Sequence, residues 1–154
     1  MWDSGDAIEQ FTASDECMAG AQRNIPCADY FNSGHDEGSA FDSRSDAKGP
    51  EPEGLTIGTL GGKTFLFLGL ERMGGILVYD ITDPTAPVMQ DYLNSREDWV
   101  TEDTESVLAS AGDLGPEGLV FIPASDSPND KALLVGGYEV SGTTAVYEVE
   151  ALRD

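Results

Sequence analysis

The tripeptide Pro-Glu-Gly occurs twice in this sequence, each time directly before an apolar run of the kind that forms a strand. The first copy places Glu53 in KGPEPEGLTIG, and the second places Glu117 in LGPEGLVFI. Proline stiffens the approach and glycine permits a tight bend or a close backbone contact, so each corner presents one carboxylate. Carboxylates held close together repel unless a cation lies between them. Such oxygen ligands suit Ca²⁺ or another divalent metal ion; local capping of backbone N–H groups is the alternative.

An acidic loop precedes the first corner, in the segment FNSGHDEGSAFDSRSDAKGPEPEG. Asp and Asn side chains at short spacing can wrap Ca²⁺ with side-chain and carbonyl oxygens, but this spacing is not that of an EF-hand. A solvated acidic loop is the alternative. The candidate metal ligands are the carboxylates of this loop and of the two corners: Asp36, Asp42, Asp46, Glu51, Glu53 and Glu117.

Three further residues are candidates for the same site. Glu71 and Glu139 recur at matching strand ends, each before a glycine turn, where they either line the same face or pair with a basic residue. Arg44, in DSRSD, is the candidate for a catalytic role, since a guanidinium can hold an anion such as phosphate beside a metal. Nothing near Ser43 or Ser45 supplies a base in the arrangement that activates a nucleophile, so no nucleophile is assigned.

The two corners belong to a longer internal repeat. PEGLTIG is followed by KTFLFLGLERMGGILVYDI, and PEGLVFI is followed by KALLVGGYEVSGTTAVYEV. The second copy is longer where PASDSPND replaces GTLGG, at a hairpin tip, which is where insertions are tolerated. Apolar runs of about five to eight residues between turn residues predict antiparallel strands. Each repeat therefore resembles one blade of a β-propeller.

The sequence predicts an all-β fold of about two to three β-propeller-like blades, a fragment of a larger ring. Residues 1–54 are expected to hold a strand end near Trp2 and the acidic Asp/Ser/Gly-rich loop, 55–93 a blade, 94–113 an acidic linker and 114–154 a blade, all in one propeller domain. Closed rings have about four to eight blades, so the remaining blades, or another copy of the chain, are expected to complete this one. A small β-sandwich is the competing architecture.

The charge of the chain limits its partners. It has 8 Lys and Arg against 29 Asp and Glu, a formal net charge of −21. Such an excess argues against nucleic-acid and anionic-membrane partners, and no run approaches the ~20 apolar residues of a membrane helix. It suits a medium rich in divalent cations or salt, while self-repulsion that only keeps the protein soluble is the alternative.

The cysteines, Cys17 and Cys27, flank a polar segment and fit no CxxC pattern. A local disulfide is expected if the protein is exported, and two free thiols are the alternative. The start MWDSGDAIEQ has neither the basic nor the apolar region of a signal peptide. We therefore expect an upstream part to be missing.

Five segments carry a family resemblance: WDSGD, FDSRSDAKGPEPEG, GLERMGGILVYDITDP, GDLGPEGLVFI and EVSGTTAVYEV. Together they resemble the choice-of-anchor I family. The resemblance implies a secreted or surface β-propeller protein several times longer than this chain, which is similar to its C-terminal part. The family includes atypical alkaline phosphatases and mesenchyme-specific cell-surface glycoproteins, and the resemblance maps no nucleophile onto this sequence.

Three functional hypotheses follow. The first is an extracellular Ca²⁺-binding propeller segment for cell-surface or matrix interaction, with a glycan, mineral or protein partner and a location that is extracellular, periplasmic or at the cell surface. The alternative is a metal-dependent alkaline phosphatase-like phosphomonoesterase, in which bound metal activates water and Arg44 steadies the phosphate ester. The third is a purely structural role, in which the acidity only confers solubility.

Overall fold

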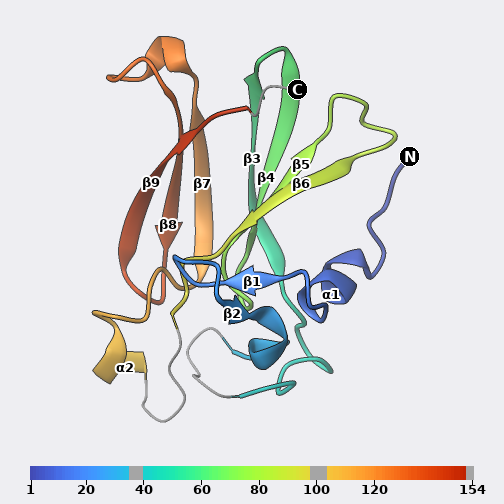
Figure 1. Ribbon diagram of the computed structural model, residues 1–154, viewed down its shortest axis with the longest axis vertical. Coiled ribbons are helices and arrows are strands. Elements are labelled where there is room, and N and C mark those ends of the chain that lie inside the picture. The colour runs from blue at the N-terminus through green and yellow to red at the C-terminus, as the bar shows by residue number, and fades with distance from the viewer. Residues whose placement is uncertain (35–39, 98–103, 152–154) are drawn as a thin grey trace.

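The fold is all-β, as predicted, and is built mainly from two antiparallel sheets (Figure 1). The computed structural model describes residues 1–34, 40–97 and 104–151. The first sheet has the order β3 (Pro52–Leu60), β4 (Lys63–Leu70), β5 (Ile76–Asp80) and β6 (Val88–Leu93). The second has the order β7 (Pro116–Ile122), β8 (Ala132–Tyr138) and β9 (Thr143–Val149). Each sheet is a meander in chain order, the arrangement of a propeller blade.

Turn residues determine the two leading hairpins. Gly61 and Gly62, with φ of +61° and +82°, make the tight turn between β3 and β4, a backbone conformation that glycine adopts without steric cost. At the matching tip between β7 and β8, a 3₁₀ turn at Ala124–Asp126 takes up the extra residues. Figure 1 shows the longer tip next to the narrow one, at the same end of the two sheets.

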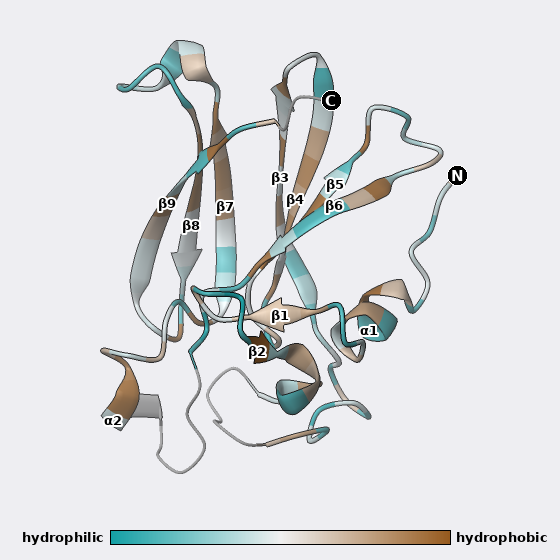
Figure 2. Cartoon of the chain, in the orientation of Figure 1, coloured by the Kyte–Doolittle hydropathy of each residue, from teal (hydrophilic) through white to brown (hydrophobic). Residues whose placement is uncertain are grey.

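The two sheets pack face to face through apolar side chains. Cross-strand partners in an antiparallel sheet share a face, which places Phe67 of β4 and Val78 of β5 together. Phe121 of β7 stacks on Phe67 with the ring centroids 5.7 Å apart, and Leu119 and Leu134 of the second sheet complete this core. Figure 2 shows the hydrophobic segments that recur along the strands of both sheets.

The N-terminal segment covers part of the other face of the first sheet. It contains helix α1 (Ala7–Thr12), a ribbon of β1 (Met18–Ala19) and β2 (Ile25–Pro26), and a 3₁₀ turn (Cys27–Tyr30). Ile8 of α1 is buried in a core with Leu70, Leu77 and Tyr79 of the first sheet. Residues 1–4 have no regular secondary structure, where a strand end was expected, and Gly5 and Asp6 form a turn. The helix that follows buries Ile8 against the sheet.

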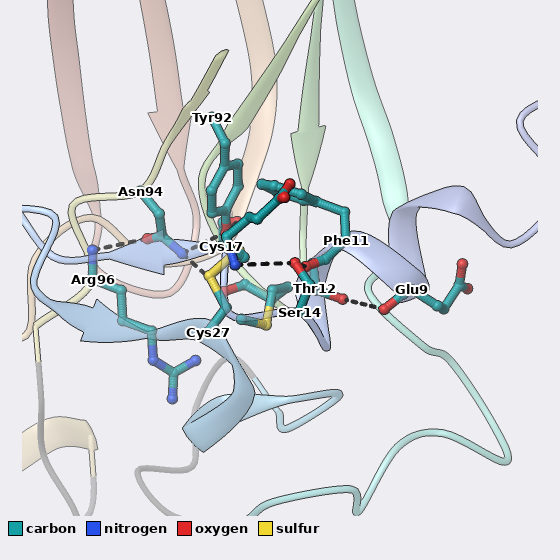
Figure 3. The surroundings of a disulfide bond; sticks show 12 residues. Glu9, Phe11, Thr12, Ser14, Cys17, Cys27, Tyr92, Asn94 and Arg96 are labelled. Carbon is teal, nitrogen blue, oxygen red and sulfur yellow. Dashed lines mark hydrogen bonds between the residues drawn. A yellow bond between two sulfur atoms is a disulfide. The ribbon is translucent and has the colours of Figure 1, made fainter. Parts of the chain in front are cut away.

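A disulfide joins Cys17 to Cys27 across this ribbon, with the Cα atoms 5.3 Å apart. Figure 3 shows it next to Tyr92 at the end of β6. Phe11 of α1 packs on the same tyrosine edge to face, with ring centroids 5.5 Å apart. The cross-link therefore holds the ribbon where it supports the outer strand of the first sheet, and a closed loop of this size contributes about 3 kcal/mol to stability.

The segment that joins the two sheets contains helix α2 (Thr104–Val107), and the expected division of the chain into blades and an acidic linker stays a prediction. Within the residues that the structure describes, no helix is long and apolar enough to cross a membrane.

Candidate functional site

The two Pro-Glu-Gly corners have the same backbone structure. The N–H of Glu71 donates to the carbonyl of Glu51 at 2.8 Å in the first corner, and the N–H of Glu139 donates to that of Gly115 at 2.9 Å in the second. In both, the register of the leading strand shifts directly after the proline, as a β-bulge does. The repeat in the sequence is therefore a repeat of backbone geometry.

The two corners also lie against each other. A Cβ built on Gly54 would lie 2.0 Å from the carbonyl oxygen of Glu117, so only glycine permits this approach. At Gly118, the equivalent residue of the second corner, a Cβ would meet nothing within 4 Å. The contact brings the backbone next to Glu53 against that of Glu117, and both glutamate side chains are exposed.

The first corner holds a pair of carboxyl groups. Glu71 is 7% exposed. Arg72 Nε lies 2.8 Å from Glu51 Oε2 and 3.9 Å from Glu71 Oε2, and Lys48 Nζ lies 2.8 Å from Glu51 Oε1. Burial opposes the ionisation of Glu51, but hydrogen bonds with these two cations and with Glu71 lower its pKa to about 2.

The two carboxyl groups of this pair have widely separated pKa values. Burial, the hydrogen bond with Glu51 and the charge of Glu53 raise the pKa of Glu71 to about 7, against the attraction of the guanidinium beside it. Like charges held together do not both ionise readily. Between about pH 2 and about pH 7 the pair therefore holds one proton, with Glu71 as its carrier.

Glu71→Gln should remove a fall in stability that the wild-type protein shows as pH rises. The pKa of Glu71 is about 7 in the folded protein, above its ordinary value of 4.5, so between these values the folded state binds the proton and the unfolded state does not. Its contribution to stability is therefore lost as pH rises through this window. From about pH 5 to about pH 8, the variant should gain on the order of 2 kcal/mol over wild type, measured by urea unfolding.

Glu139→Gln is the matched control, because Glu139 occupies the equivalent position of the second corner and is exposed. Its pH profile of stability should follow that of wild type. Identical pH profiles for Glu71→Gln and wild type would show that the buried carboxyl is not the source of the effect.

The acidic loop is organised around Asn32. The Arg44 N–H donates to the carbonyl of Asn32 at 2.9 Å, and Asn32 Nδ2 donates to Ser45 Oγ at 2.9 Å. The Ser45 hydroxyl in turn donates to the carboxylate of Asp42. The Ser45 hydroxyl thus takes part in two hydrogen bonds within the loop, which gives no support for Ser45 as a nucleophile. The phosphomonoesterase alternative stays a prediction.

Two buried oxygens in this loop have no hydrogen-bond partner among the described residues: Asn32 Oδ1 and Ser33 Oγ. Asn32 is 3% exposed and Ser33 is fully buried. A buried polar atom left without a partner costs about 1–3 kcal/mol. An amide oxygen is also a ligand that Ca²⁺ accepts. Asn32 was part of the predicted acidic loop, but its burial was not evident from the sequence.

The structure brings only some of the predicted site residues together. Glu51, Glu53 and Glu71 gather at the first corner, and the second corner, with Glu117 and the exposed Glu139, lies against it, whereas Asp46 is exposed in the acidic loop. Asp42 lies in the loop, and Asp36 lies outside the described residues. In the described ranges, no group of three or more Asp, Glu, His or Cys residues is arranged to hold a metal ion. Ca²⁺ binding by the full predicted set therefore stays a prediction.

A buried polar network after β6 was missed by sequence reasoning. Asn94 Nδ2 donates to the carbonyl of Met73 at 3.2 Å and to the hydroxyl of Tyr92 at 2.8 Å, while its Oδ1 accepts from the Arg96 N–H at 2.9 Å. The Arg96 guanidinium lies over the ring of Tyr30, 4.4 Å from its centroid. Figure 3 shows Asn94 and Arg96 next to the disulfide. The signal in the sequence is a polar run, NSRE, directly after a strand.

Comparison with known proteins places this chain in a family. The model of the choice-of-anchor I domain matches residues 1–84, more than half of the chain. Gigasin-3a of Magallana gigas is 29% identical over 120 residues, which cover 72% of this chain and 40% of the relative. The chain thus spans about 40% of that relative's length, and no solved structure matches. The family and the disulfide fit an extracellular domain. The chain belongs to the choice-of-anchor I domain family.

Proposed function

We propose that this chain is an extracellular Ca²⁺-binding β-propeller segment that acts in cell-surface or matrix interaction. The observation that supports Ca²⁺ most directly is Asn32 Oδ1, a buried oxygen with no hydrogen-bond partner among the described residues. It belongs to a side chain that is linked through Ser45 to the carboxylate of Asp42. A hard cation with oxygen ligands gives such an oxygen a partner and offsets the carboxylate charge.

The backbone of this loop also suits a binding turn. Asn32 and Asp42 have φ of +44° and +60°, a left-handed conformation that Asn and Asp tolerate better than other side chains do. The N–H of Asp42 donates to the carbonyl of Phe31 at 2.8 Å, so Asp42 is held next to the residue before Asn32. Holding the ligands in place before binding lowers the entropic cost of binding.

The corners provide the surface through which the segment acts. Glu53 and Glu117 are exposed, the backbones of their corners are in contact, and the chain has a net charge of −21. Exposed carboxylates of this kind bind divalent cations weakly, through water as well as directly. A cation held there bridges the protein to an anionic glycan, mineral or protein, which is the interaction that we propose.

Ca²⁺ should raise the thermal stability of the wild-type protein, because a ligand that binds only the folded state stabilises it. At about 100 times the dissociation constant the gain is about 2.7 kcal/mol. Asp42→Asn keeps the side-chain shape and removes the charge, so its gain should be markedly smaller. The measurement is thermal unfolding by circular dichroism, with and without Ca²⁺ at constant ionic strength.

Asp83→Asn is the matched control. Asp83 also accepts hydrogen bonds within a turn, from the N–H and hydroxyl of Thr85, but lies between β5 and β6. It should retain the full Ca²⁺ effect. An unchanged unfolding temperature for wild type at saturating Ca²⁺ would rule out the Ca²⁺ part of the proposal.

A further inference from the structure

Ser33 lies at the end of a tight turn that follows the 3₁₀ turn at Cys27–Tyr30. Its N–H donates to the carbonyl of Tyr30 at 3.0 Å. Phe31 has φ of −47° and ψ of 121°, and Asn32 has φ of +44°, which is close to a type II β-turn with Asn at its left-handed position. The turn therefore determines the backbone of Asn32 and Ser33.

The hydroxyl of Ser33 has no hydrogen-bond partner among the described residues, although the residue is fully buried. A hydroxyl group rotates to reach an acceptor nearby, so the surroundings, and not one rotamer, leave it without a partner. The preceding residue has the same property in Asn32 Oδ1. Two consecutive buried oxygens of this kind indicate an occupant that takes oxygen ligands.

The acidic loop lies against this turn. The N–H of Arg44 donates to the carbonyl of Asn32 at 2.9 Å, and the N–H of Asp42 donates to that of Phe31 at 2.8 Å. Ser45 Oγ accepts from Asn32 Nδ2 and donates to the carboxylate of Asp42. One carboxylate is thus held near the Asn32 amide.

The charge around the two buried oxygens is low for a Ca²⁺ site. An amide and a hydroxyl are neutral, and Asp42 adds one carboxylate. Arg96 is 1% exposed, and its Nη1 donates at 3.4 Å to the carbonyl of Gly34, the residue after Ser33. A buried guanidinium repels a second cation nearby. This balance of charge favours weak binding over tight binding.

We propose that Ser33 Oγ and Asn32 Oδ1 bind the same Ca²⁺ ion, in a site of low charge that fills at millimolar Ca²⁺. The assignment rests on the proposed function, because it adds a ligand and an affinity range to the same site. Ca²⁺ sites with fewer charged ligands bind more weakly, and extracellular modules work at about 10⁻⁴–10⁻³ M. The segment would therefore respond to the Ca²⁺ concentration around it instead of holding the ion permanently.

An ordered water molecule is the alternative occupant, since it would also give both oxygens a partner. The two occupants make different predictions for Ser33→Ala. A hydroxyl that holds a water molecule stabilises the fold equally with and without Ca²⁺. A hydroxyl that binds Ca²⁺ matters only when the ion is present.

An NMR titration of the isotope-labelled chain with CaCl₂, at constant ionic strength, tests the proposal. The amides of Asp42 and Arg44 donate to the turn, so they distinguish binding here from weak binding at exposed carboxylates elsewhere. In wild type both should shift, with a dissociation constant of about 10⁻⁴–10⁻³ M. Ser33→Ala should raise this constant about tenfold. In EDTA it should unfold at the wild-type temperature or above, because no hydrogen bond is lost.

Asn32→Asp changes the charge of the site in the opposite direction. It places a second carboxylate near that of Asp42, so it should lower the dissociation constant about tenfold. It should also lower the unfolding temperature in EDTA, where the added buried charge has no cation beside it. A loss of stability without any gain in affinity would overturn the low-charge site.

Ser127→Ala is the matched control. Ser127 is 9% exposed and its hydroxyl donates to Asn129 Oδ1 at 2.7 Å, in the tip between β7 and β8. This variant should lose stability in EDTA because it loses a hydrogen bond, and it should bind Ca²⁺ as wild type does.

Two results for Ser33→Ala would overturn the proposal and leave the proposed function standing: a wild-type dissociation constant, or an equal loss of stability with and without Ca²⁺, which would indicate water. If Ca²⁺ raises the unfolding temperature of wild type but does not shift the amides of Asp42 and Arg44, the ion binds elsewhere and the proposal is equally overturned. If neither responds at millimolar Ca²⁺, the proposed function fails as well.

Discussion

Gly54→Ala should destabilise the protein by about 3 kcal/mol, the upper part of the range for a residue forced into a packed site. Its Cβ would lie 2.0 Å from the carbonyl oxygen of Glu117 and 2.9 Å from the carbonyl carbon. Both atoms belong to backbone, which cannot rotate away as a side chain can. The two sheets must therefore move apart, which also loosens the stacking of Phe67 on Phe121. Urea unfolding, with its midpoint and slope, measures the loss.

Gly118→Ala is the control for this change. Neither glycine has a positive φ, so alanine is conformationally allowed at both. The new methyl group at Gly118 would meet nothing within 4 Å, and a less flexible unfolded chain would add at most about 1 kcal/mol of stability. Equal losses for the two variants would show that close approach of the corners is not what requires Gly54.

Asn94→Ala should cost about 3 kcal/mol, because it removes the partners of groups that remain buried. Asn94 is 2% exposed and its amide makes three hydrogen bonds, to Met73, Tyr92 and Arg96. Alanine leaves the Arg96 N–H and the Met73 carbonyl without their side-chain partner. The free energy of unfolding in urea measures the effect.

Asn129→Ala is the control for Asn94→Ala, because the two asparagines take part in the same number of hydrogen bonds and differ in burial. The Asn129 side chain also takes part in three hydrogen bonds, with Glu148, Ser127 and the Lys131 N–H, but it is exposed. Water replaces these partners, so the cost should stay below about 1 kcal/mol. Similar losses at Asn94 and Asn129 would contradict the importance of burial.

The strands and their grouping were predictable because hairpins are local. GTLGGK and MGGIL carry turn glycines between apolar runs, and the repeated PEG marks the start of each sheet. By contrast, helix α1 has only six residues, too short for a periodic pattern, and it exists through the packing of Ile8 on the first sheet. The sequence of residues 1–54 therefore predicted only a strand end and an acidic loop, although part of this region is ordered by contacts with distant residues.

The equivalence of the two corners was predictable from the sequence, but the surroundings of their carboxyl groups were not. Sequence placed Glu71 and Glu139 in equivalent positions, and the backbone hydrogen bonds agree. Only the fold shows that Glu71 is buried against Glu51 whereas Glu139 is exposed. The same holds for Gly54 and Gly118, which look identical in PEG and differ in what lies beside them. These differences arise from residues that are distant in the sequence but close in the fold, so the repeated motifs themselves do not reveal them.

The hairpin tips lie at the opposite end of the sheets from the two corners (Figure 1). The tip between β7 and β8 has already accepted extra residues as a 3₁₀ turn, while the register of the corner after Pro116 matches that of the first sheet. Lengthening a loop costs little entropy. The tip at Ala124–Asp126 is therefore the natural place to engineer a tag or a grafted peptide, because cargo there would extend away from the carboxylates.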